Sequence, residues 1–343
     1  MSMDGQRIEY FSILLHKVFS QILDLYYDIS KKDVGSISGV SFLNPLIKVL
    51  ERGYGKDINF DGITPTQLSS CQFVYPRTNN VVVCFSGGKD STALAMLLKN
   101  MGKNVFLYHV RGINKSYPDE VNRAVRVASL LELPLYIDEV KLIGGSIYKE
   151  NPLKNQVIAT LALNYSISQH LDVSIAFGDF TEDTAERSVF DRNWSDCVEM
   201  WNAYREVISK IVPNFELHIP FKNYLETLLV VGREPTLLNA VQGCLAPQRF
   251  RRHWHDMNEK KYKVSLLPNR CGSCWKCCVE YLYLTDNNLL EYNEAFYLHC
   301  LELLRSKIPE EHPSCVGVKS YEDVYKVYIK APVPERVKKL SFN

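Results

Sequence analysis

The sequence predicts an α/β protein built on a doubly wound parallel sheet, and two observations support this fold class. Runs of apolar, often β-branched residues indicate buried strands at 81–85, 105–110 and 135–140. Apolar residues with helical spacing lie between these runs, at 92–99 and 121–131. Strands that alternate with helices of this length predict parallel pairing, with ligands bound beyond the carboxyl ends of the strands.

The alternation continues past the third strand and then stops. A helix is expected from about Leu153 to His170, followed by a strand within the segment DVSIAFGD. After about residue 235 the sequence becomes rich in Cys, Pro, Arg and His, and helical spacing returns near Tyr281 and from Tyr292 to Ile308. A domain boundary is therefore expected near residue 235.

The first 75 residues form an extension that the sequence predicts to be mainly helical. Apolar residues recur every three or four positions between Ile8 and Ile29, which is the pattern of a helix with one apolar stripe. Packing on the core and contact with a second copy or a partner both remain open for this stripe. We therefore divide the chain into residues 1–75, an α/β domain at 76–235, and a Cys-rich, helical region at 236–343.

Composition and charge exclude several classes of protein. The chain has 343 residues, of which 46% are hydrophobic and 23% charged, values that are typical of globular proteins. Forty basic and 39 acidic residues give a formal net charge of +1, so the overall charge favours neither nucleic acid nor anionic membrane. The sequence shows no secretory signal pattern and no run of about 18 uncharged apolar residues. We therefore expect a cytoplasmic protein without a membrane span.

The first strand runs into the glycine turn of the segment VVVCFSGGKDSTALAMLL, at residues 81–98. Two adjacent glycines let backbone amides approach a ligand, and the following helix directs its free N–H groups and its positive dipole end to the same place. The segment has neither the GxxxxGK[ST] nor the GxGxxG pattern. The glycines and the helix start thus indicate a site for an anion such as phosphate, flanked by hydroxyls, and the Asp90 carboxylate is placed to hold Mg²⁺ or to orient the phosphates.

The residues SGGKDS resemble the PP-loop of the N-type ATP pyrophosphatase superfamily. This resemblance implies a Rossmann-like, adenine nucleotide alpha hydrolase-like domain that binds ATP with Mg²⁺ and cleaves it between the α and β phosphates. It also implies that Lys89 and Asp90 have catalytic roles. His109, at the end of the second strand, either borders the adenine or satisfies the strand end. The implied ATP-binding residues are Ser86, Gly87, Gly88, Lys89, Asp90, Ser91, His109, Gly178 and Asp179.

Further segments resemble the 7-cyano-7-deazaguanine synthase (QueC) family over roughly residues 78–290. The segment NPLKNQ is similar to a P-x-R-N segment of that family, with Lys154 in place of arginine and Asn155 retained. The segments AFGDFTED and SDCVEMWNA are similar to its acidic strand end and its Pro-Asp-Cys stretch, although Ser195 replaces the proline. Asp196 is implied to be catalytic as well. The implied substrate-binding residues are Lys154, Asn155, Asp183 and Asp196.

The segment CGSCWKC supplies three thiolates, Cys271, Cys274 and Cys277, at spacings that bring them to one ion. The same family resemblance implies Cys244 as the fourth zinc ligand, although the intervening segment is longer here than in the family. Four thiolates would make the zinc structural. An iron–sulfur cluster and unliganded thiols are the alternatives. Other candidates for the fourth ligand are Cys278, His253, His255 and Cys300.

The segment between these cysteines, residues 247–263, is locally basic and is expected to be a loop. It is either a solvated insertion or a contact for a phosphate-bearing or macromolecular substrate, for which Arg side chains offer bidentate hydrogen bonds.

The resemblance to the synthase family implies an ATP-dependent C–N ligase. In that family the acceptor is 7-carboxy-7-deazaguanine, ammonia is the nucleophile, and an amide is converted to the nitrile. One alternative is a related enzyme used in antiphage defence, which attaches a deazaguanine-type group to a protein or nucleic acid. A second is a PP-loop tRNA thiolase, and a third is an ATP-binding protein without turnover. A homodimer is also left open by the sequence.

Overall fold

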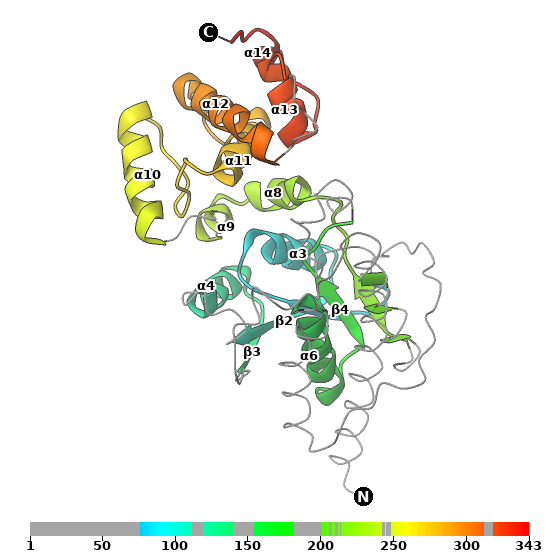
Figure 1. Cartoon of the computed structure of the whole chain (residues 1–343). Coiled ribbons are helices and arrows are strands. Elements are labelled where there is room, and N and C mark those ends of the chain that lie inside the picture. Colours follow the sequence, from blue (N-terminus) through cyan, green and yellow to red (C-terminus); the bar gives the residue numbers. More distant parts are fainter. Residues whose placement is uncertain are drawn as a thin grey trace, which may run out of the picture. The chain divides into compact units, whose positions relative to one another are not determined.

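The computed structural model describes two compact units of the chain (Figure 1). One contains the described residues up to Ser86 and from Asp90 to Tyr224, and the other contains Gly87–Lys89 and the described residues from Leu225 onward. The N-terminal extension, Asp183 and Asp196 lie outside the described residues. The division into regions 1–75, 76–235 and 236–343 that the sequence suggests stays a prediction. The described residues are 76–111, 120–139, 154–181, 201–202, 204–205, 208–209, 212, 214–241, 244, 248–311 and 318–342.

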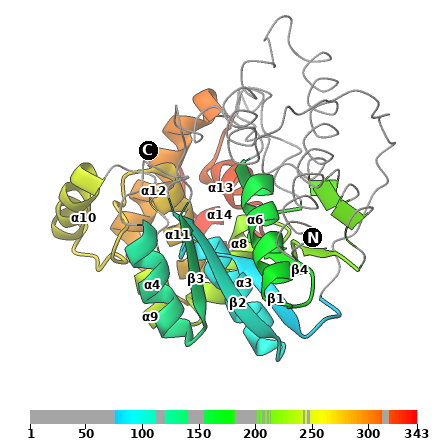
Figure 2. The same ribbon diagram turned by 90° about the horizontal axis from the view of Figure 1, so that it is seen from below.

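The first unit is built on a parallel five-stranded sheet with the order β3-β2-β1-β4-β5. Figure 2 shows β3, β2, β1 and β4 side by side in this order. The prediction of a parallel α/β sheet is confirmed, and the short fifth strand is an addition to it. The strands are β1 (Asn80–Cys84), β2 (Asn104–Arg111), β3 (Leu135–Glu139), β4 (Ser174–Phe177) and β5 (Glu216–His218).

The central strand β1 is apolar after its first residue, Asn80, because both of its faces are covered. Val81, Val82 and Val83 have no exposed surface, and Val82 pairs with Phe106 on β2 and Ile175 on β4. A strand buried on both faces reads as a continuous apolar run rather than as an alternating one. This burial is why the run at 81–85 was recognisable from the sequence.

Three helices connect the strands of this sheet. They are α3 (Lys89–Asn100), α4 (Glu120–Leu131) and α6 (Lys154–Ser168). Right-handed crossovers put α3 and α4 on one face of the sheet and α6 on the other, as Figure 1 shows. Since each helix runs back against the strands, all three helices begin at the edge of the sheet where the parallel strands end.

The second unit is helical in its described part, as the sequence predicts for the C-terminal region. Helix α11 packs on α12 and α13, and α13 also packs on α14. The helices are α8 (Tyr224–Gly232), α9 (Pro235–Ala240), α10 (Gln248–Tyr262), α11 (Trp275–Asp286), α12 (Glu294–Glu311), α13 (Tyr321–Ile329) and α14 (Glu335–Lys338).

The expectation of a basic loop at 247–263 is wrong, because residues Gln248–Tyr262 form the helix α10. The helix has a buried side at Asn258 and a half-buried side at Trp254, four residues apart. The abundance of charged residues concealed this spacing. None of the helices that the structure describes is long and apolar enough to cross a membrane.

Candidate nucleotide site and metal centre

The candidate nucleotide loop connects the end of β1 to the start of α3. Gly87 has a φ of 65°, a left-handed conformation that glycine adopts without the steric cost of a Cβ. Ser91 Oγ accepts a hydrogen bond from Ser86 N at 3.2 Å and lies 3.2 Å from Ser86 Oγ. The two serines thus hold the ends of the loop together, and the loop leads into the first turn of α3, which contains Asp90.

The end of β4 approaches this loop closely at Gly178. A Cβ on Gly178 would lie 2.8 Å from Ser91 N and 2.9 Å from the carbonyl carbon of Asp90. These are backbone atoms, so no side chain can move aside to make room. Glycine is therefore required at position 178 by the position of the loop, a reason that the sequence alone does not reveal.

We expect Gly178→Ala to weaken ATP binding by about tenfold, because moving the Ser91 amide misplaces a phosphate donor. Isothermal titration with a non-hydrolysable ATP analogue measures this change. Gly102→Ala is the control for a glycine replacement away from the loop: its φ of 74° makes the change strain the local backbone, but a Cβ there has nothing within 4 Å. Equal ATP affinity of the Gly178→Ala variant and the wild type would contradict this interpretation of the loop.

Arg123, which the sequence reasoning missed, contacts the loop from the first turns of α4. Its Nη2 donates to Ser86 O at 3.3 Å and lies 3.9 Å from Glu120 Oε1. The only available signal was its place near the start of a helix that begins at the carboxyl edge of the sheet. Arg123 therefore adds a cation beside the loop that anionic ligands would use.

His109 and Asp179 lie at the ends of β2 and β4, beside the loop. His109 is buried, and its Nδ1 is 2.8 Å from Phe85 O, so one ring nitrogen is engaged by the backbone at the strand end. Asp179 is buried as well and accepts hydrogen bonds from Phe180 N at 3.0 Å and from Trp201 Nε1 at 2.8 Å. These bonds fix the Asp179 carboxylate in position. ATP contacts of either residue stay a prediction.

Lys89 is buried, with 2% of its surface exposed. Its Nζ donates to Thr227 Oγ1 on α8 at 2.8 Å, and both residues group with the second unit. A phosphate contact of Lys89 stays a prediction, and it would have to be made alongside this hydrogen bond or in its place.

Lys154 and Asn155 begin α6, at the edge of the sheet where the strands end. Asn155 is buried in this position. The backbone thus brings the Lys-Asn pair to the same edge as the glycine loop, which agrees with ligand binding outside the carboxyl ends of parallel strands. Their role in substrate binding stays a prediction, as do the roles of Asp183 and Asp196.

Four cysteines of the second unit come together in a cluster. The Sγ atoms of Cys244, Cys271, Cys274 and Cys277 all lie within 4.8 Å of one another. Cys271 and Cys277 are 3.8 Å apart and Cys244 and Cys274 are 4.0 Å apart. A tetrahedron with Zn–S bonds of about 2.3 Å has sulfur–sulfur edges of about 3.8 Å. The cluster therefore fits zinc, with Cys244 as the fourth thiol.

The chemistry of these thiols also favours a cation. The Cys244 sulfur, followed by those of Cys271 and Cys274, raises the pKa of Cys277 well above its usual range, and burial adds to this. Adjacent thiolates repel one another unless a cation offsets their charge. Four thiolates would fill all four coordination positions of a tetrahedral divalent ion, which is the arrangement of a structural zinc.

The surrounding chain is shaped around this cluster. Gly272 has a φ of 66°, and a Cβ there would lie 3.0 Å from Asn258 Nδ2 and 3.0 Å from Leu266 Cδ1. Asn258, on α10, donates to Cys271 O at 2.8 Å and to Ser273 Oγ at 2.8 Å. Trp254, also on α10, packs against the cysteines. The loop that carries the cysteines, which we call the metal loop, is therefore held in place by direct contacts with α10.

The remaining cysteines of the described residues are buried and lie outside the cluster. They are Cys84, Cys278 and Cys300. Burial raises the pKa of Cys84, and Cys278 Sγ donates to Gly272 O at 3.9 Å. Because they are buried, these three thiols are not accessible in the way that a catalytic thiol is.

Comparison with known proteins gives distant matches to solved structures. No protein-family model matches the chain, and no curated protein matches it. The chain is similar to the crystal structure of a predicted subunit of tRNA methyltransferase from Methanocaldococcus jannaschii, with 21% identity over 42% of this chain and 68% of that chain and a TM-score of 0.28.

Two further solved structures are similar to the chain. NH₃-dependent NAD synthetase from Campylobacter jejuni has 16% identity over 42% of this chain and 58% of that chain, with a TM-score of 0.26. NMN synthetase from Francisella tularensis has 11% identity over 68% of this chain and 100% of that chain, with a TM-score of 0.28. Likeness at this level carries no argument about fold or function, so both rest on the residues and the structure of this chain.

Proposed function

We propose that this protein is an ATP-dependent ligase that adenylates a carboxylate and transfers the acyl group to a nitrogen nucleophile. The observation that supports this most directly is the glycine loop. Its residues SGGKDS stand between a buried parallel strand and a helix, and its Ser91 amide is approached so closely by Gly178 that only glycine fits. Such a loop offers backbone N–H groups and a helix dipole to phosphates.

The proposed reaction has two steps, and in each the loop stabilises charge on a phosphate leaving group. A carboxylate oxygen of the acceptor attacks the α-phosphorus of ATP, a new P–O bond forms, and pyrophosphate leaves. The nitrogen nucleophile then attacks the acyl carbon, loses a proton, and displaces AMP. The backbone amides of Gly87 and Gly88, with the hydroxyls of Ser86 and Ser91, would stabilise charge on the departing phosphates.

Magnesium suits this site because Asp90 adds a carboxylate oxygen to the hydroxyls of the loop, and oxygen ligands are what Mg²⁺ prefers. When bound, it would supply positive charge to the phosphate chain. Arg123, which already donates to Ser86 O, would add a second cation from α4. The chain thus provides cationic and hydrogen-bonding partners for the triphosphate within the first turns of α3 and α4.

For the acceptor, we propose 7-carboxy-7-deazaguanine or a related carboxylate, with ammonia as the nucleophile. The support is the Lys154-Asn155 pair at the start of α6, which begins at the same edge of the sheet as the loop. A cation and an amide side chain are suited to a carboxylate and a purine-like edge. We propose Asp183 and Asp196 as further contacts of this acceptor.

To test this, the protein is incubated with ATP that is radioactively labelled on its α-phosphorus, together with Mg²⁺, ammonia and one of a panel of carboxylates that includes 7-carboxy-7-deazaguanine. The labelled products are then identified. Labelled AMP with release of pyrophosphate is the expected result, together with a mass change of the acid. Labelled ADP as the product would refute the adenylation chemistry. AMP formed only with a different carboxylate would refute the proposed acceptor and retain the ligase.

We expect Asp90→Asn to reduce AMP formation by about 100-fold, because it removes the loop carboxylate while keeping its shape. Steady-state rates at saturating ATP measure the change. Asp256→Asn, which alters an exposed carboxylate on α10, is the matched control and is expected to retain the wild-type rate. An Asp90→Asn rate within twofold of the wild type would exclude Asp90 from the reaction.

A further inference from the structure

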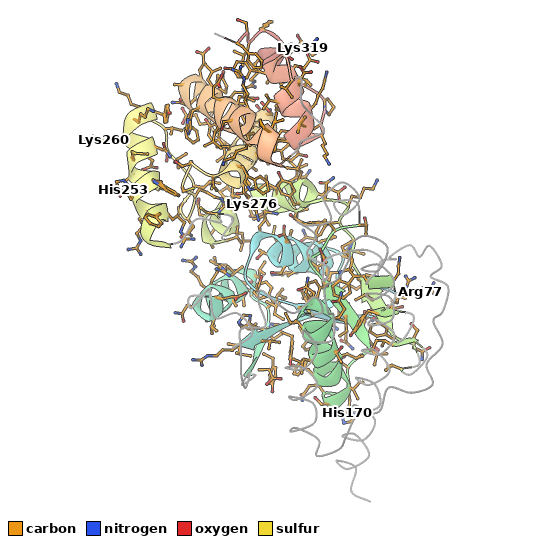
Figure 3. The ribbon with its side chains drawn as sticks, viewed as in Figure 1. Arg77, His170, His253, Lys260, Lys276 and Lys319 are labelled. Carbon is orange, nitrogen blue, oxygen red and sulfur yellow. The ribbon has the colours of Figure 1, made fainter. Side chains whose placement is uncertain are left out.

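The glycine loop contains one lysine, and its side chain is buried. Lys89 is the fourth residue of SGGKDS and is 2% exposed. Every other lysine whose exposure the structure describes is at least partly exposed, among them Lys260 and Lys319, which Figure 3 labels on the second unit. An ammonium group is seldom buried unless it has polar partners, because leaving water costs free energy. The burial of Lys89 therefore requires a partner in the interior.

Thr227 supplies such a partner from α8. Its Oγ1 accepts a hydrogen bond from Lys89 Nζ at 2.8 Å. Thr227 has no exposed surface and lies on a helix face whose other buried side chains, those of Leu225, Leu228 and Val231, are apolar. A hydrogen bond to a charged group is worth more than one between neutral groups. Thr227 is thus the residue of this face that is suited to hold an ammonium group.

This hydrogen bond bears on the shape of the glycine loop. Lys89 directly follows the glycine pair at 87–88 and is the first residue of α3. Glycines have many accessible conformations, so the contacts on either side of the pair determine where its amides lie. Before the pair, Ser86 N donates to Ser91 Oγ. After it, Lys89 Nζ is held by Thr227. Thr227 can therefore affect phosphate binding without contacting the nucleotide.

We propose that Thr227 is a positioning residue of the ligase, which fixes the glycine loop by holding the Lys89 ammonium group in the second unit. The inference rests on the proposed function, because it takes the loop to bind the phosphates of ATP. The Thr227 side chain has two chemically different groups, a hydroxyl that binds Lys89 and a methyl that fills buried space. Only the hydroxyl matters for this role, so variants that remove one group at a time distinguish positioning from packing.

The test measures binding of a non-hydrolysable ATP analogue with Mg²⁺ to the zinc-loaded full chain by isothermal titration. Thr227→Val keeps the shape of the side chain, and we expect about tenfold weaker binding because the ammonium loses its partner and the loop shifts. Thr227→Ser keeps the hydroxyl and is expected to stay within about twofold of the wild type. Packing alone predicts the opposite order, since only the serine leaves a cavity. A Thr227→Val protein that binds the analogue at least as tightly as Thr227→Ser would overturn the proposal.

A double-mutant cycle tests whether Thr227 acts through Lys89. In a Lys89→Met background, Thr227→Val is expected to change the affinity by less than about twofold, because the hydrogen bond is already absent. An equal loss in both backgrounds would contradict the proposed role. Thr285→Val makes the same change at a buried threonine of α11 and is the matched control, which is expected to retain the wild-type affinity.

These measurements separate the role of Thr227 from the proposed reaction, because binding needs neither an acceptor nor turnover. If the wild type binds the analogue but converts labelled ATP to ADP, the ligase is refuted, and the order of the Thr227 variants still decides the positioning role. A wild type that does not bind the analogue would overturn both proposals.

Discussion

Cys277→Ala is expected to remove zinc and to unfold the second unit, while Cys278→Ala is expected to retain both. The two residues are neighbours at the start of α11, and both are buried. Cys277 Sγ belongs to the cluster of four, whereas Cys278 Sγ points to Gly272 O. Structural zinc sites contribute about 10–16 kcal/mol of apparent binding free energy, which is available to the folded state alone. Losing one of four thiolates therefore has a far larger effect than removing a neighbouring buried thiol.

Zinc content by mass spectrometry under native conditions, with hydrogen exchange of peptides from α11 and α12, measures both parts of this prediction. The wild type and Cys278→Ala are expected to hold one zinc ion and to protect these peptides. Stoichiometric zinc in the Cys277→Ala protein would show that the ligand set is wrong. If the wild type instead contains iron and sulfide, the bound group is an iron–sulfur cluster and not zinc, with the same four thiols as ligands.

The sheet of the first unit was predictable because its strands are buried on both faces. Val81, Val82 and Val83 form an unbroken apolar run, and an amphipathic pattern marks the helix Glu120–Leu131. Strand β5 was missed because Glu216–His218 is short and carries two polar residues. Its place is decided by pairing with β4, where Leu217 meets Ile175, and such long-range register is not written in a local pattern.

The loop could be predicted as a candidate phosphate site from its own residues, but the contacts that shape it could not. Six described elements, from α3 to β4, stand between the loop and Gly178 in the sequence, and only the packed sheet brings Gly178 against the Ser91 amide. Arg123 reaches Ser86 O for the same reason. Residues that serve a site through close approach or through a backbone hydrogen bond have no spacing rule, so sequence patterns do not find them.

Helix α10 shows a different limit of sequence reasoning. A stretch with this many charges suggests a solvated loop, and the spacing of Trp254 and Asn258 becomes meaningful only once the cysteines are seen behind them. The spacing of Cys271, Cys274 and Cys277 predicted three members of the cluster, because thiol spacing is a local property, whereas Cys244 was indicated by the family resemblance. The packing of α10 on the loop that carries the cysteines depends on tertiary contacts, so only the structure reveals it.

Glu280→Gln is expected to destabilise the second unit by about 3–5 kcal/mol, since it leaves a buried guanidinium without its carboxylate. Arg270 Nε lies 2.5 Å from Glu280 Oε2, and the side chains are 4% and 2% exposed. Arg270 Nη1 also donates to Val241 O at 3.1 Å. Burial lowers the pKa of Arg270, but the Glu280 carboxylate outweighs it and the net pKa is raised. The sequence gives no hint of this pair, because the two residues stand on either side of the metal loop.

A double variant separates the cost of an unpaired charge from the value of the pair itself. Arg270→Met with Glu280→Leu removes both charges and keeps similar volumes, so it is expected to recover most of the stability lost in Glu280→Gln. Glu322→Gln is the control for an exposed pair, in which Lys326 Nζ and Glu322 Oε1 lie 2.7 Å apart and the side chains are 55% and 35% exposed. That change is expected to cost at most about 1 kcal/mol because water screens the charges. Hydrogen exchange of the most protected amides in α11 of the zinc-loaded protein gives the free energies. A cost for Glu280→Gln no larger than that for Glu322→Gln would show that the buried pair is not what holds this part of the unit together.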